Sequence, residues 1–407
     1  MKGPLAPLPA DSQVRPPSSG DRSLAGQIVT ATACRVILNT GRRFAYPFAP
    51  ALSRGMNVPL TAITSLIAVM QVTGILGILG GPLADRWGYR KVMLAATAMM
   101  AVGMVVVWAA PYYWVVMVGL FVAGLSKTLF DPAIYGYTGR RVPFSQRGRV
   151  IGVLEFAWAG SALIGIPLVG LSIASMGWQA PFWMLGACAL VGMGFILYLF
   201  PRDANVGERA NLESWRVAWA RLVKERQAIG LMGFAFWASL GNDQLFVVYG
   251  AWMELSFGMG VAAIGLGTGI IGAAELIGEV LTAIIGDRMG LKRAAMLGAV
   301  VAAVAYGLLP LFNAGPSIAL SGLFLIFLVF EFSMVCGISL STEALPQYRA
   351  TMVAAYLGVG GMGRIIGSLV GGPVWLAGGI DAVGAVSATA SALSAGCLLW
   401  GMGLRSR

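Results

Sequence analysis

The stretch "GGPLADRWGYRKVM", residues 80–93, places four charged side chains in a short turn between two long apolar runs. Part of it, "DRWGYRK" at 85–91, returns as "DRMGLKR" at 287–293, an offset of 202 residues. The segments "LSRGMNV" at 52–58 and "LSFGMGV" at 255–261 repeat at an offset of 203. Because the matches keep their order and nearly the same spacing, they indicate two homologous halves related by a parallel repeat.

The residues on either side of this turn are strongly apolar, as is most of the chain. Of 407 residues, 58% are hydrophobic and 11% are charged, whereas about a quarter of a soluble protein is charged. The apolar blocks are about 20–25 residues long, enough for a helix to cross a bilayer. We therefore expect an all-α integral membrane protein with twelve spans, near residues 28–52, 59–84, 92–110, 114–138, 150–173, 181–200, 229–253, 262–285, 294–312, 318–342, 351–375 and 383–403.

The polar segments divide the chain into five parts. We expect a disordered cytosolic tail over 1–27, six-helix bundles over 28–201 and 229–403, a cytosolic linker over 202–228, and a short cytosolic tail over 404–407. In the linker, Leu212, Trp215, Trp219 and Leu222 recur at helical spacing. That spacing predicts an amphipathic helix on the membrane surface.

The basic residues predict the orientation. With cytosolic termini, 22 of the 28 Lys and Arg residues lie in the tails and inner loops, and one, Arg54, lies in an outer loop. This positive-inside bias predicts that both ends face the cytosol. It also explains the net charge of +11 without nucleic acid binding, because the basic residues sit in loops between apolar blocks.

Several chemistries are excluded by the residues that the sequence lacks. The chain has no histidine, and its cysteines form no CxxC pair, so we expect no metal site and no cofactor. There is no HExxH, GxSxG or GxxxxGK[ST] pattern, which argues against an intramembrane enzyme and against direct use of ATP. We therefore expect no catalytic residues.

The opening stretch resembles the signature loop of the major facilitator superfamily. The matching positions are Gly81, Leu83, Asp85, Arg86, Gly88 and Arg90, with Tyr89 where a basic residue is commoner. The second copy keeps Asp287, Arg288, Gly290 and Lys292, but has Ala283 in place of the first glycine. The resemblance covers residues 28–403 and extends to bacterial drug and solute efflux permeases. It implies that Asp85 and Asp287 hold one face of the carrier closed at a helix N-terminus, and that the basic residues anchor the loops.

A second motif lies in the fifth predicted span, "GSALIGIPLVG" at 160–170. Pro167 and Gly170 fit the glycine–proline motif of antiporters, whereas Ile166 stands where that motif has glycine. We expect Glu155, Pro167, Gly170 and Arg364 to pack where the two halves meet.

The resemblance also implies that the first helix of each three-helix unit lines a central cavity. Buried charge inside a membrane is costly and marks functional sites. The candidate substrate residues on these four helices are Arg42, Arg43, Tyr46, Lys127, Asp131, Asp243 and Glu331.

The first helix carries a polar stripe, because Arg35, Asn39, Arg42 and Tyr46 fall on one face at 100° per residue. Arg35 is close enough to the predicted cytosolic edge to extend its charge into water. Arg42 and Arg43 lie deeper. They are either counter-ions of Asp131, Asp243 or Glu331, or the binding site of an anionic group.

Three carboxylates are candidates for proton coupling: Asp131, Glu275 and Glu279. Glu275 and Glu279 are one helical turn apart and would share a proton in dry surroundings, unless Arg364 or another polar contact neutralises one of them. Asp131 is four residues after Lys127, so the two can form an ion pair. Either this pair is structural, or Asp131 exchanges partners, with Arg42 or Arg43 competing for it beside the bend at Pro132.

These features favour a secondary transporter that works by alternating access, with proton-coupled efflux of a small organic solute. The alternatives are uptake or exchange of an organic anion through Arg42 and Arg43, and a carrier-like sensor or scaffold that transports nothing. The expected partners are the solute, protons and the lipid bilayer, and the protein is expected to be a monomer in a bacterial inner membrane.

Overall fold

The computed structural model describes residues 23–76, 80–142, 144–202, 220–345 and 349–403. The regular elements in these ranges are all helices. The first group is α1 (Leu24–Arg43), α2 (Ala49–Met56), α3 (Leu60–Leu76), α4 (Gly80–Trp87), α5 (Tyr89–Ala109), α6 (Tyr113–Arg141), α7 (Phe144–Gly160), α8 (Ile166–Met176) and α9 (Ala180–Leu199). The second is α11 (Arg226–Phe257), α12 (Val261–Leu281), α13 (Asp287–Met289), α14 (Leu291–Gly307), α15 (Leu309–Phe312), α16 (Pro316–Ala344) and α17 (Arg349–Met402).

Some of the sequence expectations concern residues outside these ranges. The residues outside the described ranges include most of the tail expected over 1–27, the tail over 404–407, and Leu212, Trp215 and Trp219 of the expected surface helix.

The first helix begins at Leu24, with the Ser23 side chain accepting a hydrogen bond from the backbone N–H of Gly26 at 3.1 Å. A serine in this position satisfies a donor that the helix itself leaves open.

The chain is a multi-pass membrane protein. Seven helical segments in its described part are long and apolar enough to cross a membrane, and an eighth follows if the bent pair α2–α3 counts as one span. The helices outside that set include α1, α11 and the 17-residue α14. Both α1 and α11 bury polar and charged side chains, among them Arg35, Asn39, Asn242 and Asp243. Several of these side chains belong to the site described below.

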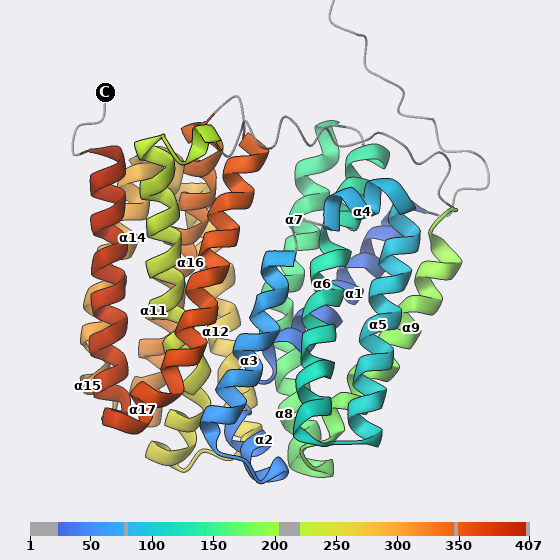
Figure 1. The fold of residues 1–407 in the computed structure, drawn as a ribbon, viewed down its shortest axis with the longest axis horizontal. Coiled ribbons are helices and arrows are strands. Elements are labelled where there is room, and N and C mark those ends of the chain that lie inside the picture. The colour runs from blue at the N-terminus through green and yellow to red at the C-terminus, as the bar shows by residue number, and fades with distance from the viewer. Residues whose placement is uncertain (1–22, 77–79, 143, 203–219, 346–348, 404–407) are drawn as a thin grey trace, which may run out of the picture.

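The two groups of helices stand side by side (Figure 1). They separate at the end where α11 begins and α17 ends, and they converge at the opposite end, where α3 lies against α17 and α8 against α12. Helical breaks shape both groups. Residues 44–48 turn the chain between α1 and α2, π-helical segments follow α7 at Ser161–Gly165 and α12 at Thr282–Gly286, and α17 turns back at Gly378–Gly379.

Glycines let the two groups approach closely at the convergent end. Gly170 of α8 faces Gly265 of α12, and a Cβ added to either would lie 3.1 Å from the Cα of the other. Gly250 of α11 lies against the carbonyl group of Pro47. Near the turns that follow, Arg54 of α2 and Glu254 of α11 form a partly exposed ion pair. Small residues permit such contacts between membrane helices, and here they close this end of the molecule.

Candidate substrate cavity

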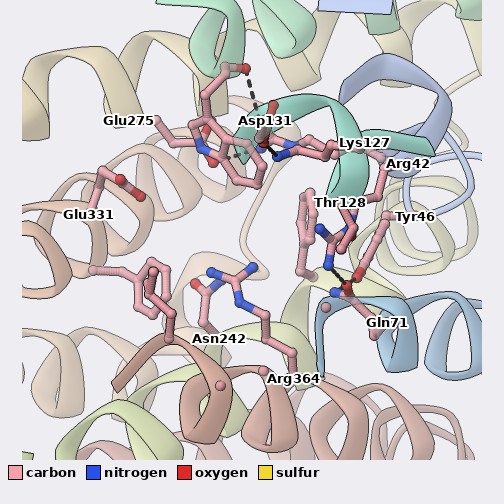
Figure 2. Close-up of a pocket in the computed structure, with 18 of the residues that line it drawn as sticks. Arg42, Tyr46, Gln71, Lys127, Thr128, Asp131, Asn242, Glu275, Glu331 and Arg364 are labelled. Atoms are coloured by element: carbon pink, nitrogen blue, oxygen red, sulfur yellow. Dashed lines mark hydrogen bonds and ion pairs between the residues drawn. The ribbon is translucent and has the colours of Figure 1, made fainter. Parts of the chain in front are cut away.

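A cavity of about 420 Å³ lies between the two groups (Figure 2). Its lining residues on α6, α11 and α16 fall near the middle of those helices. That volume falls in the range of small-molecule sites. Both groups line it, through α1, α3, α6 and α7 on one side and α11, α12, α16 and α17 on the other. It extends toward the first turns of α17, where Ala354 and Leu357 line it, so its deep end is the convergent one.

A hydrogen-bonded network joins the two sides of the cavity. Gln71 of α3 accepts from Arg42 at 2.5 Å and donates to Asp243 of α11 at 3.2 Å. Asp243 also accepts from the Tyr46 hydroxyl at 3.0 Å, and its second oxygen lies 3.5 Å from the Arg364 guanidinium. Asp243 is fully buried, so its charge depends on these neighbours. One carboxylate thus lies close to two guanidinium groups.

Arg43 forms a second link between the two sides. It donates to Glu275 of α12 at 2.6 Å, and the two side chains are 2% and 4% exposed. Its guanidinium lies over the Trp158 ring at 4.3 Å from the centroid and donates to the Trp158 carbonyl oxygen at 3.2 Å. Hydrogen bonds and the aromatic face together hold this buried charge.

Asp131 of α6 is contacted by two cations. Lys127, one turn earlier, donates to one of its oxygens, and Arg35 of α1 donates to the other at 2.9 Å. Arg35 also donates to the Leu154 carbonyl oxygen at 2.5 Å. The expectation that Arg35 extends to the membrane edge is therefore wrong, because it is 3% exposed and Asp131 supplies its counter-charge.

The expectations for Arg42 and Arg43 are only partly met. Both line the cavity, but among the described residues Asp131 forms ion pairs with Arg35 and Lys127, and Arg43 pairs with Glu275 instead. Arg42 contacts the neutral Gln71. The arginine of α1 that pairs with Asp131 is thus Arg35, two helical turns before the expected Arg42.

Glu331 of α16 differs from the other carboxylates of the cavity. It points into the open space from the side opposite Arg42 and Tyr46 (Figure 2). No hydrogen bond or ion pair joins it to another described residue. Glu279 of α12 is half-buried and is likewise without such a contact in the described part of the chain, whereas Glu275 is held by Arg43. The arrangement agrees with the alternative that a polar contact neutralises one of the two, with Arg43 rather than Arg364 as the partner of Glu275.

The two signature loops are built alike. Gly88 and Gly290 have positive φ angles of 98° and 82° and precede α5 and α14, a conformation that glycine adopts without strain. Arg90 donates to the Leu197 carbonyl oxygen at the end of α9, and Lys292 to the Met402 carbonyl oxygen at the end of α17. Arg86 and Arg288 are exposed. Gly81 lies in α4, and the side chains of Asp85 and Asp287 lie outside what the structure describes.

The four residues expected where the halves meet have different surroundings. Gly170 does contact the other group, through Gly265. Pro167 is partly buried one turn earlier on α8. Glu155 instead accepts from Tyr135 and lies 3.6 Å from Arg35, within its own group. Arg364 of α17 lines the cavity instead, and its guanidinium lies 3.5 Å from the Asp243 carboxylate.

Several lining residues were not among the candidates. They include Gln71, Gly74, Thr128, Trp158 and Asn242. Gln71 could have been found, because it is a lone amide in the otherwise apolar and hydroxylated run of α3. Asn242 precedes Asp243 and accepts a hydrogen bond from Tyr306 at 3.1 Å. Nothing in the local sequence distinguishes Trp158 from the other tryptophans.

This arrangement, with helices in two groups around a central charged cavity, matches a known family. A model described as Major Facilitator Superfamily matches residues 31–249, more than half of the chain. The chain belongs to the Major Facilitator Superfamily. It is therefore a transporter protein, as the signature loop suggested.

Individual members of the superfamily are similar over most of the chain. An uncharacterized MFS-type transporter of Bacillus subtilis, YwfA, is 24% identical over 351 residues, which is 85% of each protein. The class G tetracycline resistance protein of Vibrio anguillarum is 27% identical over 249 residues, 58% of this chain and 60% of that protein. The crystal structure of a mutant of the nucleoside transporter NupG superposes with a TM-score of 0.76 over 94% of this chain and all of that one, at 14% identity. This last likeness is one of fold.

Proposed function

We propose that this protein is a secondary transporter that exports a small organic solute by alternating access, driven by protons. The observation that carries the proposal is the charged cavity between the two helix groups, closed at one end by Gly170, Gly265 and the Arg54–Glu254 ion pair. A site at the interface of two repeats, reached from one side at a time, is the arrangement that alternating access requires. Similarity to a tetracycline resistance protein supports export.

The same proposal includes the topology. It has twelve spans, and the protein acts as a monomer in a bacterial inner membrane. Both ends lie in the cytosol, which is the orientation favoured by the 22 Lys and Arg residues that the sequence assigns to the tails and inner loops. In that orientation the cavity of this structure faces the cytosol, and the closed end faces outward. Solute would then enter from the cytosol and leave after the glycine contacts of the closed end separate.

Proton coupling needs a carboxylate that can alternate between a proton and another partner. Asp131 is held by two cations and Glu275 by one. Glu279 and Glu331 lie in the spans without a cation at ion-pair distance in the described residues, and a proton is the simplest counter-charge for each. Of the three carboxylates singled out for coupling, Glu279 is thus the one that we retain, and Glu331 joins it.

The test is transport by purified protein in liposomes. Efflux of a stabilising compound should depend on an imposed pH gradient, and Glu331→Gln or Glu279→Gln should weaken that dependence. Glu343→Gln, an exposed position at the end of α16, serves as the control. Transport with the same rate in the presence and absence of the gradient would rule out proton coupling.

A second candidate is uptake or exchange of an organic anion. Arg42 and Arg364 both line the cavity near a single carboxylate, Asp243, and this observation favours an acidic solute. Accumulation of a labelled anion against its gradient, in liposomes loaded with the same unlabelled anion, would support exchange. Export driven by protons alone, with no response to internal anion, would exclude it.

A further inference from the structure

Only some of the charged side chains of the cavity form close ion pairs with one another. Arg43 is paired with Glu275, and Asp131 with Arg35 and Lys127. The remaining charged groups fall into two places. Arg42 and Arg364 lie near Asp243, and Glu331 lies across the open space from Arg42 (Figure 2).

The first place holds two guanidinium groups and one carboxylate, so most of the guanidinium N–H groups are not bonded to Asp243. Asp243 already accepts from Tyr46 and Gln71 on one oxygen, and its contact with Arg364 is an ion pair at 3.5 Å rather than a short hydrogen bond. Arg42 gives one N–H to Gln71 and has no carboxylate within ion-pair distance in the described chain. A guanidinium can bind a carboxylate through two parallel hydrogen bonds, so these two leave room for one acidic group of a ligand.

The second place lacks a positive charge. Glu331 follows Phe327 and Phe330 on α16, and all three side chains line the cavity. A carboxylate among apolar side chains is costly without a partner. A basic group of the ligand would supply that partner. Phe246 also lines the cavity. Its ring stacks on Tyr46 of the first place at 4.3 Å between centroids and meets Phe327 of α16 edge to face at 5.2 Å, so aromatic side chains connect the two places.

The charges of the two places cancel. Once Glu331 has released its proton, Arg42 and Arg364 are positive and Asp243 and Glu331 are negative, so the four groups together are neutral. A solute with one acidic and one basic group preserves this balance. A solute that is only an acid or only a base would leave one net charge in a low-dielectric space, which is unfavourable.

We propose that the transported solute is amphoteric, with an acidic group bound between Arg42 and Arg364, a basic group bound to Glu331, and an apolar body against Phe246 and Phe327. This inference rests on the proposed transport function and names the substrate class for the same cavity. It also resolves the choice between Arg42 and Arg43, because Arg43 is already committed to Glu275.

The experiment measures thermal stabilisation of the purified full-length protein. The probes are four sets of aromatic compounds of matched size: amphoteric, acidic only, basic only and uncharged. A ligand that binds the folded state raises the apparent Tm, and we expect the largest shifts from the amphoteric set. Converting the acidic group of the best compound to a neutral amide should weaken its binding about tenfold or more.

Substitutions test which residues bind the acidic group and which bind the basic group of the ligand. Arg42→Gln and Arg364→Gln should remove the preference for amphoteric over basic compounds, and Glu331→Gln should remove the preference over acidic ones. Matched controls are Glu343→Gln, exposed on the same helix as Glu331, and Arg226→Gln, where α11 begins beside Trp400. Both should keep the wild-type order of compounds.

The outcomes separate this inference from the transport function. Equal or larger shifts with basic, acidic or uncharged compounds, no shift with any set, or variants that keep the wild-type order would each overturn the amphoteric site. The best compound, of whichever class, is then tested in liposomes. Its transport would uphold the transporter even if the amphoteric assignment fails, whereas amphoteric binding without transport would uphold the site and refute the function.

Discussion

Asp131 illustrates how a single residue can be shared by distant parts of the chain. Its partner Lys127 is four residues away and was evident from the helical spacing. Arg35 is 96 residues away, and no local pattern could connect the two. The same holds for Arg43 and Glu275, which are 232 residues apart. Sequence reasoning found the charged residues of the site because charge is rare in the spans, but it could not pair them across helices.

The two partners of Asp131 make the cost of its removal predictable. Asp131→Asn leaves Arg35 and Lys127 without their main counter-charge and should destabilise the protein by about 3–5 kcal/mol. Lys127→Met should cost less, because Arg35 still holds Asp131. Thermal unfolding of both variants gives the comparison. Equal losses of stability would show that the Arg35 contact contributes nothing.

Glu275 and Glu279 should also differ, although they are one turn apart on α12. Glu275→Gln removes the counter-charge of the buried Arg43 and should lower the apparent Tm markedly, by the equivalent of about 3 kcal/mol or more. Glu279→Gln removes no ion pair and should leave the Tm nearly unchanged. If the two variants unfold alike, the Arg43 contact is not the source of stability.

At the scale of elements, most helical ranges could be predicted because long apolar runs must be helical in a bilayer. The run expected over 92–110 is α5, Tyr89–Ala109, and that over 114–138 is α6, Tyr113–Arg141. The bends were harder to predict. Prolines mark both of them, because Pro47 lies in the turn at 44–48 and Pro167 lies just after the π-helical segment Ser161–Gly165. A proline interrupts the helical hydrogen bonds because it has no N–H, but whether the helix then turns or only widens depends on packing between helices.

The close crossing of α8 and α12 gives a prediction of its own. Gly265→Leu would place a large side chain where the Gly170 Cα lies 3.1 Å from the new Cβ, so the convergent end should separate. A cysteine at Ala49, which is fully buried there, should then react faster with a maleimide. Gly269→Leu is the control on the same helix, because nothing lies within 4 Å of a Cβ at that position. Unchanged labelling in Gly265→Leu would mean that this crossing does not close the end.

For the whole molecule, the Arg54–Glu254 pair joins the two groups at the closed end. If transport requires this end to open, a covalent link there should stop it. We expect cysteines at 54 and 254, joined by a short bifunctional thiol reagent in a background without the four native cysteines, to abolish transport. A cleavable reagent should restore transport when it is reduced. Full activity of the linked protein would contradict alternating access through this end.

The turn at Gly378–Gly379 bears on how the protein is inserted during synthesis. As one straight helix, the 54 residues of α17 would extend about 81 Å at 1.5 Å per residue, far more than the roughly 30 Å of a bilayer core. The segment fits only because Gly379 adopts a φ of 60° and a ψ of −148°, a region in which side chains are strained. With almost no loop between its arms, it would have to enter the bilayer as one hairpin. The non-helical backbone of Gly378 and Gly379 is therefore what reverses the direction of the last arm.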